Sequence, residues 1–262
     1  MNKNALLSLT LLIVLVANIA AIAVPASAYV TGTVAIIQPD MVVPGGAIEI
    51  ELSEDFQADG GYVYIYLSKD ADPEISSGDV RIAKLTKSDI MAELPYVTSL
   101  EVPTTIQEGE EYYVKVTDSS KVGASCIVSE DSVEVLEKDE WPTITIDPES
   151  GSVPREVTVE GEDINEDWEM LTVELYWDDY EQMLGTWDVE DFTEFTAEDV
   201  PIPEAFMGKH KVLVLLRNEE TVGTYVEFEV EPSVDLVLPA TFSLLADEPE
   251  LEQTIQISAH GF

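Results

Sequence analysis

Residues 144–164 read ITIDPESGSVPREVTVEGEDI. This stretch holds an apolar segment, a turn bracketed by Pro148 and Pro154, and an alternating run from Val157 to Val159. Proline fixes φ and lacks an N–H donor, so it suits a turn or a strand end and not a central strand. Alternation with a period of two places aliphatic side chains on one face, as in a half-buried strand. The stretch therefore predicts a strand, a proline turn and a second strand.

The same pattern occurs twice more in the chain. Residues 36–56 read IIQPDMVVPGGAIEIELSEDF, and residues 244–262 read LLADEPELEQTIQISAHGF. The closing residues Phe56, Ile164 and Phe262 lie 108 and 98 residues apart (164 − 56 and 262 − 164). These separations match a small sandwich domain and not a solenoid repeat. The sequence therefore predicts an all-β chain of tandem immunoglobulin-like β-sandwich domains.

Matching downstream segments give the predicted domain boundaries. Gly109 precedes a predicted strand at residues 112–116, and Gly208 precedes one at residues 211–215. Matching positions of the first two units lie 108 residues apart at the start of the unit but only 98 residues apart near its end. The first unit therefore carries extra residues in its middle, and we place them in the turn-like loop 68–79. The predicted parts are a signal peptide (1–28), a first sandwich (29–138), a second sandwich (139–232) and the first two strands of an incomplete third (233–262).

The amino-terminal segment has the composition of a secretory signal peptide. Lys3 forms a short positive region, residues 5–24 are almost wholly apolar, and residues 26–28 (Ala-Ser-Ala) supply the small residues of a cleavage site. The alternative is an uncleaved anchor, because the apolar run is long enough to span a membrane. Pro25 and the small residues favour cleavage. We expect an extracellular protein at the cell surface, with no transmembrane segment in the mature chain.

The net charge limits the possible partners. The chain has 53 acidic and 12 basic residues, a formal charge of −41, and loss of Lys3 with the signal peptide would make it −42 (−41 − 1). Nucleic acids and anionic membranes bind basic patches, so neither is an expected partner. Such a surface repels its neighbours unless cations screen it.

Catalytic motifs and a disulfide framework are absent from the sequence. Cys126 is the only cysteine, and His210 and His260 are the only histidines. No G-x-S-x-G motif and no Asn-x-Ser/Thr sequon occurs. We expect that the chain is not an enzyme, that it is not N-glycosylated, and that Cys126 is a small buried apolar residue or, less simply, an intermolecular bridge.

One turn in the second unit has the ligand spacing of a calcium loop. Carboxylate or amide oxygens recur at alternate positions, with a carboxylate at the twelfth, and alternate residues can wrap around one ion. The residues of this pattern are Asp163, Asn165, Asp167, Glu169 and Glu174. The sixth position is Trp168, where a calcium loop has glycine, and the flanking segments are predicted strands and not helices. Asp70 and Asp72 form a second, weaker candidate for Ca²⁺. The alternative for both is a solvated acidic surface.

Three tyrosines mark a possible recognition face in the first unit. Tyr62, Tyr64 and Tyr66 alternate with aliphatic residues and so lie on one face of a predicted strand. Such a ladder can stack on a sugar or bind a partner, or it can cover a neighbouring strand or a joint between domains. The equivalent strand, residues 171–177, lacks the regular tyrosines. Residues 84–94 are expected to form a short helical turn.

The third predicted unit contains only two strands. Two strands alone cannot bury an apolar face, so this unit is incomplete. Either the natural chain continues beyond Phe262, or the two strands complete a sheet in a neighbouring molecule. Both readings describe a protein that works as part of something longer.

With its repeats laid out, the chain resembles the amino-terminal part of an archaeal surface-layer (S-layer) protein, or a similar archaeal cell-surface protein with immunoglobulin-like repeats. The features that carry this resemblance are the signal peptide, the acidity, the opening strands 36–56 and 144–164, and the strand GGYVYIYLSKD at residues 60–70. The resemblance implies a porous two-dimensional lattice of this chain with itself or other surface proteins, with divalent cations between acidic subunits. The missing sequons depart from the glycosylation common in that family.

Three hypotheses for the function follow. The first is a structural surface protein that self-associates through acidic β-sandwiches with Ca²⁺ or another divalent ion. The second is an adhesin or carbohydrate-binding module with Tyr62, Tyr64 and Tyr66 as its face. The third is a non-catalytic stalk of a larger secreted enzyme.

Overall fold

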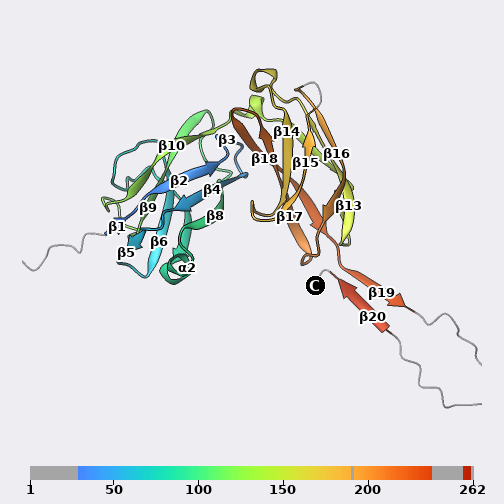
Figure 1. Ribbon diagram of the computed structural model, residues 1–262, viewed down its shortest axis with the longest axis horizontal. Helices are drawn as coiled ribbons and strands as arrows, with labels where there is room; N and C mark the ends of the chain where they lie inside the picture. Colours follow the sequence, from blue (N-terminus) through green and yellow to red (C-terminus); the bar gives the residue numbers. More distant parts are fainter. Residues whose placement is uncertain (1–28, 190–191, 238–255, 261–262) are drawn as a thin grey trace, which may run out of the picture.

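The computed structural model describes residues 29–189, 192–237 and 256–260 and contains two β-sandwiches (Figure 1). The predicted signal peptide and most of the predicted third unit lie outside the described residues. Within the described part of the chain, no helix is long and apolar enough to cross a membrane.

The first sandwich packs a three-stranded sheet against one side of a larger sheet. The strands of the smaller sheet are β2 (Val34–Gln38), β4 (Ala47–Leu52) and β8 (Tyr96–Glu101). The facing strands are, in order, β3 (Met41–Val42), β10 (Ile127–Val135), β9 (Glu110–Thr117), β6 (Tyr62–Ser68) and β7 (Val80–Thr86). Two short strands, β1 (Val30–Thr31) and β5 (Gln57–Ala58), pair at one end, and the short helix α2 (Lys87–Ala92) confirms the helical turn expected over residues 84–94.

The second sandwich repeats this strand order. Its smaller sheet contains β11 (Thr143–Asp147), β13 (Arg155–Glu162) and β16 (Phe195–Ile202). The facing strands are β12 (Ser150–Gly151), β18 (Thr221–Val230), β17 (Gly208–Arg217), β14 (Thr172–Trp177) and β15 (Met183–Asp188). In each unit the last strand pairs in parallel with a two-residue strand, β3 or β12, that follows a proline turn. The predicted fold class, tandem immunoglobulin-like β-sandwiches, is confirmed.

Four further short elements lie outside the two sandwich sheets. The 3₁₀ turn η1 (Lys138–Glu140) separates the two units, and η2 (Glu166–Trp168) lies between β13 and β14. The strands β19 (Ser233–Val237) and β20 (Gln256–His260) pair with each other in antiparallel orientation.

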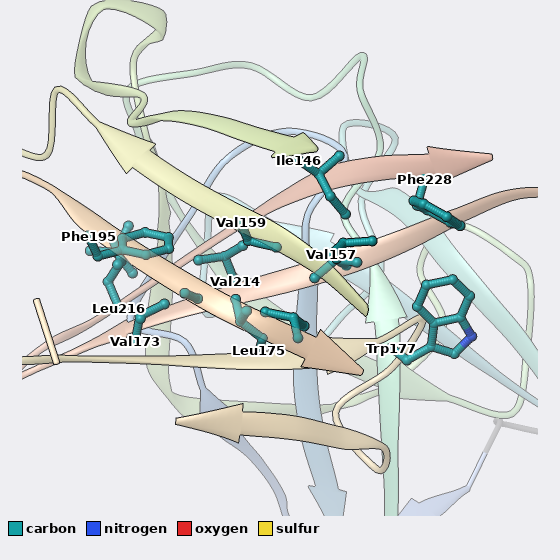
Figure 2. Close-up of a cluster of buried hydrophobic side chains, with 14 of the residues drawn as sticks. Ile146, Val157, Val159, Val173, Leu175, Trp177, Phe195, Val214, Leu216 and Phe228 are labelled. Carbon is teal, nitrogen blue, oxygen red and sulfur yellow. The ribbon is translucent and has the colours of Figure 1, made fainter. Parts of the chain in front are cut away.

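Each sandwich has its own apolar core, as the alternation in the sequence predicts. In the second unit Val157 and Val159 are buried and face Leu175 and Val214 from the opposite sheet (Figure 2). Complete burial of an aliphatic side chain contributes about 1.5–3 kcal/mol. The first unit buries an equivalent set that includes Ile48 and Ile50. Cores of this kind let both sandwiches fold without a disulfide.

The two units differ mainly in the loop between the last two strands of their larger sheets, β6 and β7 in the first unit and β14 and β15 in the second. Residues 69–79 join β6 to β7 in the first unit, whereas only residues 178–182 join β14 to β15 in the second. The longer loop therefore lies where the sequence places extra residues, and the segment containing α2 supplies the others. This loop is bound by the side chain of Lys115 in β9.

Candidate functional site

The joint between the two sandwiches is formed by backbone hydrogen bonds. Strand β3 lies between β10 of its own unit and β18 of the next, and it is parallel to both. The Asp40 amide donates to the Thr221 carbonyl over 3.1 Å, and the Val43 amide donates to the Gly223 carbonyl over 3.0 Å. One ten-stranded sheet therefore continues through both units (Figure 1).

The Asp40 side chain fixes the register at this joint. One carboxylate oxygen, Oδ2, accepts hydrogen bonds from both the backbone amide (2.8 Å) and the hydroxyl (2.9 Å) of Thr221. Close packing adds to this constraint, because a Cβ placed on Gly223 would lie 2.6 Å from Cγ of Pro39. Real Cβ atoms do not approach a neighbour so closely, and only glycine fits at this position.

A buried apolar cluster lies beside the joined strands. It contains Ala47 of the first unit and four residues of the second, Tyr176, Tyr180, Leu213 and Leu215. The Tyr180 hydroxyl donates to the Ala47 carbonyl (3.0 Å), and the Tyr180 amide donates to the Ser99 hydroxyl (3.0 Å). Burial raises the pKa of Tyr180 well above its ordinary value. This side chain therefore stays a neutral donor to the first unit.

A polar network crosses the joint on the same side. The Arg217 guanidinium donates to Glu174 (Nε to Oε2, 2.6 Å) and to the side-chain oxygen of Gln38, and Gln38 donates to Glu49 (3.0 Å). Desolvation raises the pKa of the Glu49 carboxyl. The Tyr176 hydroxyl donates to Glu174 (2.7 Å), and burial, followed by this contact, raises the pKa of Tyr176 to about 12. Each partner of Arg217 is thus fixed by a second contact, which makes the network rigid.

The predicted calcium ligands are placed in two groups. Asn165 accepts a hydrogen bond from the Asp167 amide (3.1 Å) and caps η2, while Asp163 accepts one from the Thr143 hydroxyl (3.0 Å). Glu169 ends this turn with a left-handed backbone (φ 47°). Glu174 instead lies on β14 and pairs with Arg217. Among the described residues, no group of three or more His, Cys, Asp or Glu side chains is arranged to hold a metal ion. Calcium binding by this turn stays a prediction.

The weaker candidate, Asp70 and Asp72, lies in a loop that already surrounds a cation. The Lys115 side chain is fully buried, and its Nζ donates to Asp70 Oδ1 (2.5 Å) and to the Glu74 carbonyl (3.1 Å). Nζ also lies 3.5 Å from Oδ2 of Asp79, whose side chain is 2 % exposed. An ammonium group therefore occupies the centre of this loop. This role of Lys115 was not predictable, because in the sequence Lys115 is simply one residue of the predicted strand 112–116.

The charged groups of this loop stabilise one another in their ionised forms. The hydrogen bond from Lys115 lowers the pKa of the Asp70 carboxyl. Burial alone would lower the pKa of Lys115, but the contacts with Asp70 and Asp79 raise it. Cys126 lies beside this cluster and is partly exposed, and burial raises the pKa of its thiol to about 11. The thiol is thus not activated as a nucleophile.

The tyrosine ladder packs against basic residues of its own sheet. Tyr62 is 46 % exposed, whereas Tyr66 is buried. The Lys84 Nζ lies 3.9 Å from the ring centroid of Tyr62, and the Arg81 guanidinium lies 6.0 Å from that of Tyr64. Cation–π contacts of this kind occupy ring faces that a sugar would stack on. The arrangement favours the structural alternative for this ladder.

His210 has structural partners on both ring nitrogens. Nδ1 lies 2.7 Å from the Asp178 carboxylate, Nε2 lies 2.8 Å from the Phe206 carbonyl, and the ring stacks on Trp177 at 4.9 Å between centroids. It belongs to the second sandwich and Cys126 to the first, so the structure does not bring them together as a catalytic pair.

Comparison with known proteins gives no family for this chain. No family model matches it, and no curated protein matches it. Among solved structures, it is similar to Salmonella alpha-2-macroglobulin (11 % identity, 83 % of this chain and 17 % of the other, TM-score 0.29). It is also similar to the FN1-FN3 domains of chicken CNTN1 (14 % identity, 78 % of this chain and 66 % of the other, TM-score 0.25). A further similar structure is the Escherichia coli adhesin FdeC (12 % identity, 78 % of this chain and 66 % of the other, TM-score 0.24). Such scores carry no argument about function, and the fold class rests on the strand order itself.

Proposed function

We propose that this chain is a structural protein of the cell surface and that its two sandwiches form one rigid building block of an extracellular assembly. The observation that carries this proposal is the joint, in which β3 pairs with β18 and Tyr180 is buried between the units. Domains within a chain usually move relative to one another unless their interface is large and apolar. A continuous sheet with a buried cluster and a polar network restricts that motion, as a lattice subunit or a spacer requires.

The charge of the chain supports assembly that depends on cations. At −41, copies of this chain repel one another at low salt, and a divalent ion between acidic faces reduces that repulsion. We propose that copies associate with themselves or with other surface proteins through Ca²⁺ or a similar ion, as in an archaeal S-layer. We propose a role without catalysis. In the alternative role, a non-catalytic stalk of a larger secreted enzyme, the same rigidity would hold the enzyme away from the surface.

Sedimentation of the mature chain, residues 29–262, tests this function. We expect large particles in calcium and a monomer in chelator, with sodium chloride at matched ionic strength as the control. Assembly in both salts to the same extent would show that screening alone suffices and that no divalent ion is needed. A monomer in every condition would contradict self-association.

A further inference from the structure

A pocket of about 500 Å³ opens at one end of the second sandwich, on the side of the loops that follow β13, β15 and β17. Three separate connections contribute side chains to it. The lining residues are Asp167, Trp168, Glu169, Leu171, Phe192, Asn218, Glu219 and Glu220. Two of these residues, Asp167 and Glu169, also belong to the predicted calcium turn, whereas the apolar and aromatic part of the pocket has no role in the structural function.

Backbone hydrogen bonds between the three connections hold the pocket in shape. The Leu171 amide donates to the Arg217 carbonyl (3.0 Å), and the Val189 amide donates to the Leu171 carbonyl (2.9 Å). The Ile164 amide donates to the Thr193 carbonyl (3.1 Å) in the same way. Trp168 packs against the core of the sandwich. These bonds tie the ends of the three connections together, which reduces the ordering that binding requires.

Apolar groups in the pocket are exposed to solvent. Leu171 is 51 % exposed and Phe192 is 45 % exposed. Together with the ring of Trp168 they offer an apolar and aromatic surface at a sandwich end, the place where many such domains carry recognition loops.

The charges around the pocket select the ligand. Four carboxylates line it, those of Asp167, Glu169, Glu219 and Glu220, and none of the described lining residues is basic. They are not grouped closely enough to share a metal ion. Carboxylates spread around an aromatic hollow suit a larger cation with an apolar stem, because the charged head meets oxygens or ring faces while the stem meets apolar carbon. A neutral sugar could donate hydrogen bonds to these carboxylates but would not neutralise their charge.

We propose that this pocket binds a lysine or arginine side chain of a partner polypeptide. The guanidinium of arginine fits best, since it pairs with carboxylates and also stacks on aromatic faces. This role goes beyond the structural function and does not depend on self-association. It gives the chain a way to hold a basic segment of another surface protein.

Calorimetric titration with the peptide acetyl-Gly-Arg-Gly-Arg-Gly-amide tests the proposal. The matched peptide with citrulline in place of arginine has nearly the same shape and no charge. We expect the arginine peptide to bind the mature chain and the citrulline peptide to bind at least about tenfold more weakly. Equal binding of the two peptides would overturn the proposal.

Two variants separate this pocket from general attraction to an acidic protein. Phe192→Ala and the pair Glu219→Gln and Glu220→Gln should each weaken binding about tenfold. The pair Glu156→Gln and Glu160→Gln removes the same charge from exposed positions on β13 and should leave binding within about twofold of the wild type. Equal losses in the two charge pairs, or no loss in Phe192→Ala, would show that the peptide binds by net charge and would overturn the proposal.

Discussion

Lys115 in β9 and Leu213 in β17 occupy equivalent positions in the two sandwiches. Each lies opposite a tyrosine of the neighbouring strand, Tyr66 for Lys115 and Tyr176 for Leu213, and each is buried. In the second unit this outward face is covered by the first sandwich, through Ala47. In the first unit the loop 69–79 covers it, and Lys115 holds that loop in place.

Replacement of Lys115 should therefore destabilise the first sandwich. Lys115→Met leaves the nearly buried carboxylate of Asp79 without its cation, and removal of one partner of a buried ion pair costs about 3–5 kcal/mol. Urea unfolding measures this loss. The matched control is Lys69→Met, whose pair with Glu110 is well exposed and contributes at most about 1 kcal/mol. Equal effects of the two substitutions would contradict a role for Lys115 in holding the loop.

The same cluster should give a defined dependence on acid. The pKa of Asp70 is lowered in the folded state, so its stabilising contribution is present above its ordinary pKa of 3.8 and is lost as the pH falls through the folded value. The difference in melting temperature between wild type and Asp70→Asn should be constant from about pH 7 to pH 5 and should shrink below about pH 4. A difference that grows as the pH falls would contradict this sign.

Gly223 should be essential for the joint and dispensable for each sandwich. In Gly223→Ala the new Cβ would lie 2.6 Å from Cγ of Pro39, and we expect β3 and β18 to move apart to relieve this contact. We expect small-angle scattering to show a larger radius of gyration while circular dichroism still shows two folded β-sandwiches. Gly61→Ala is the control, because nothing lies within 4 Å of a Cβ placed there. An unchanged radius in Gly223→Ala would show that the joint does not depend on this close contact.

Calcium binding at the predicted turn should not need Glu174. Its side chain is held by Arg217 and Tyr176, whereas Asp167 and Glu169 line the open pocket. The paired substitutions Asp167→Asn and Glu169→Gln should reduce calcium-dependent sedimentation, and Glu174→Gln should leave it unchanged. An equal loss from Glu174→Gln would mean that the turn rearranges around the ion.

The sandwiches could be predicted from local sequence patterns, because the side chains that a strand buries recur at every second residue. The alternation at Val157 and Val159 is visible in the sequence and matches the core. The dual pairing of β3 was not predictable, since Met41 and Val42 form an ordinary apolar pair and Val222, the partner of Met41, lies 181 residues further on (222 − 41).

The candidate site was less predictable than the fold, because spacing along the chain does not fix where a side chain points. Glu174 stands at the right distance from Asp163 for a calcium loop, but Arg217, 43 residues further on, pairs with it instead. The pocket beside Trp168 combines three loops, and no single segment of the sequence contains its pattern.

The joint should hold the two sandwiches rigidly together in solution, and ¹⁵N relaxation of the mature chain measures this. Amides of β4 in the first sandwich and of β17 in the second should report one rotational correlation time, that of a single body containing both units. Two shorter and different correlation times, each matching a separate sandwich, would contradict the account.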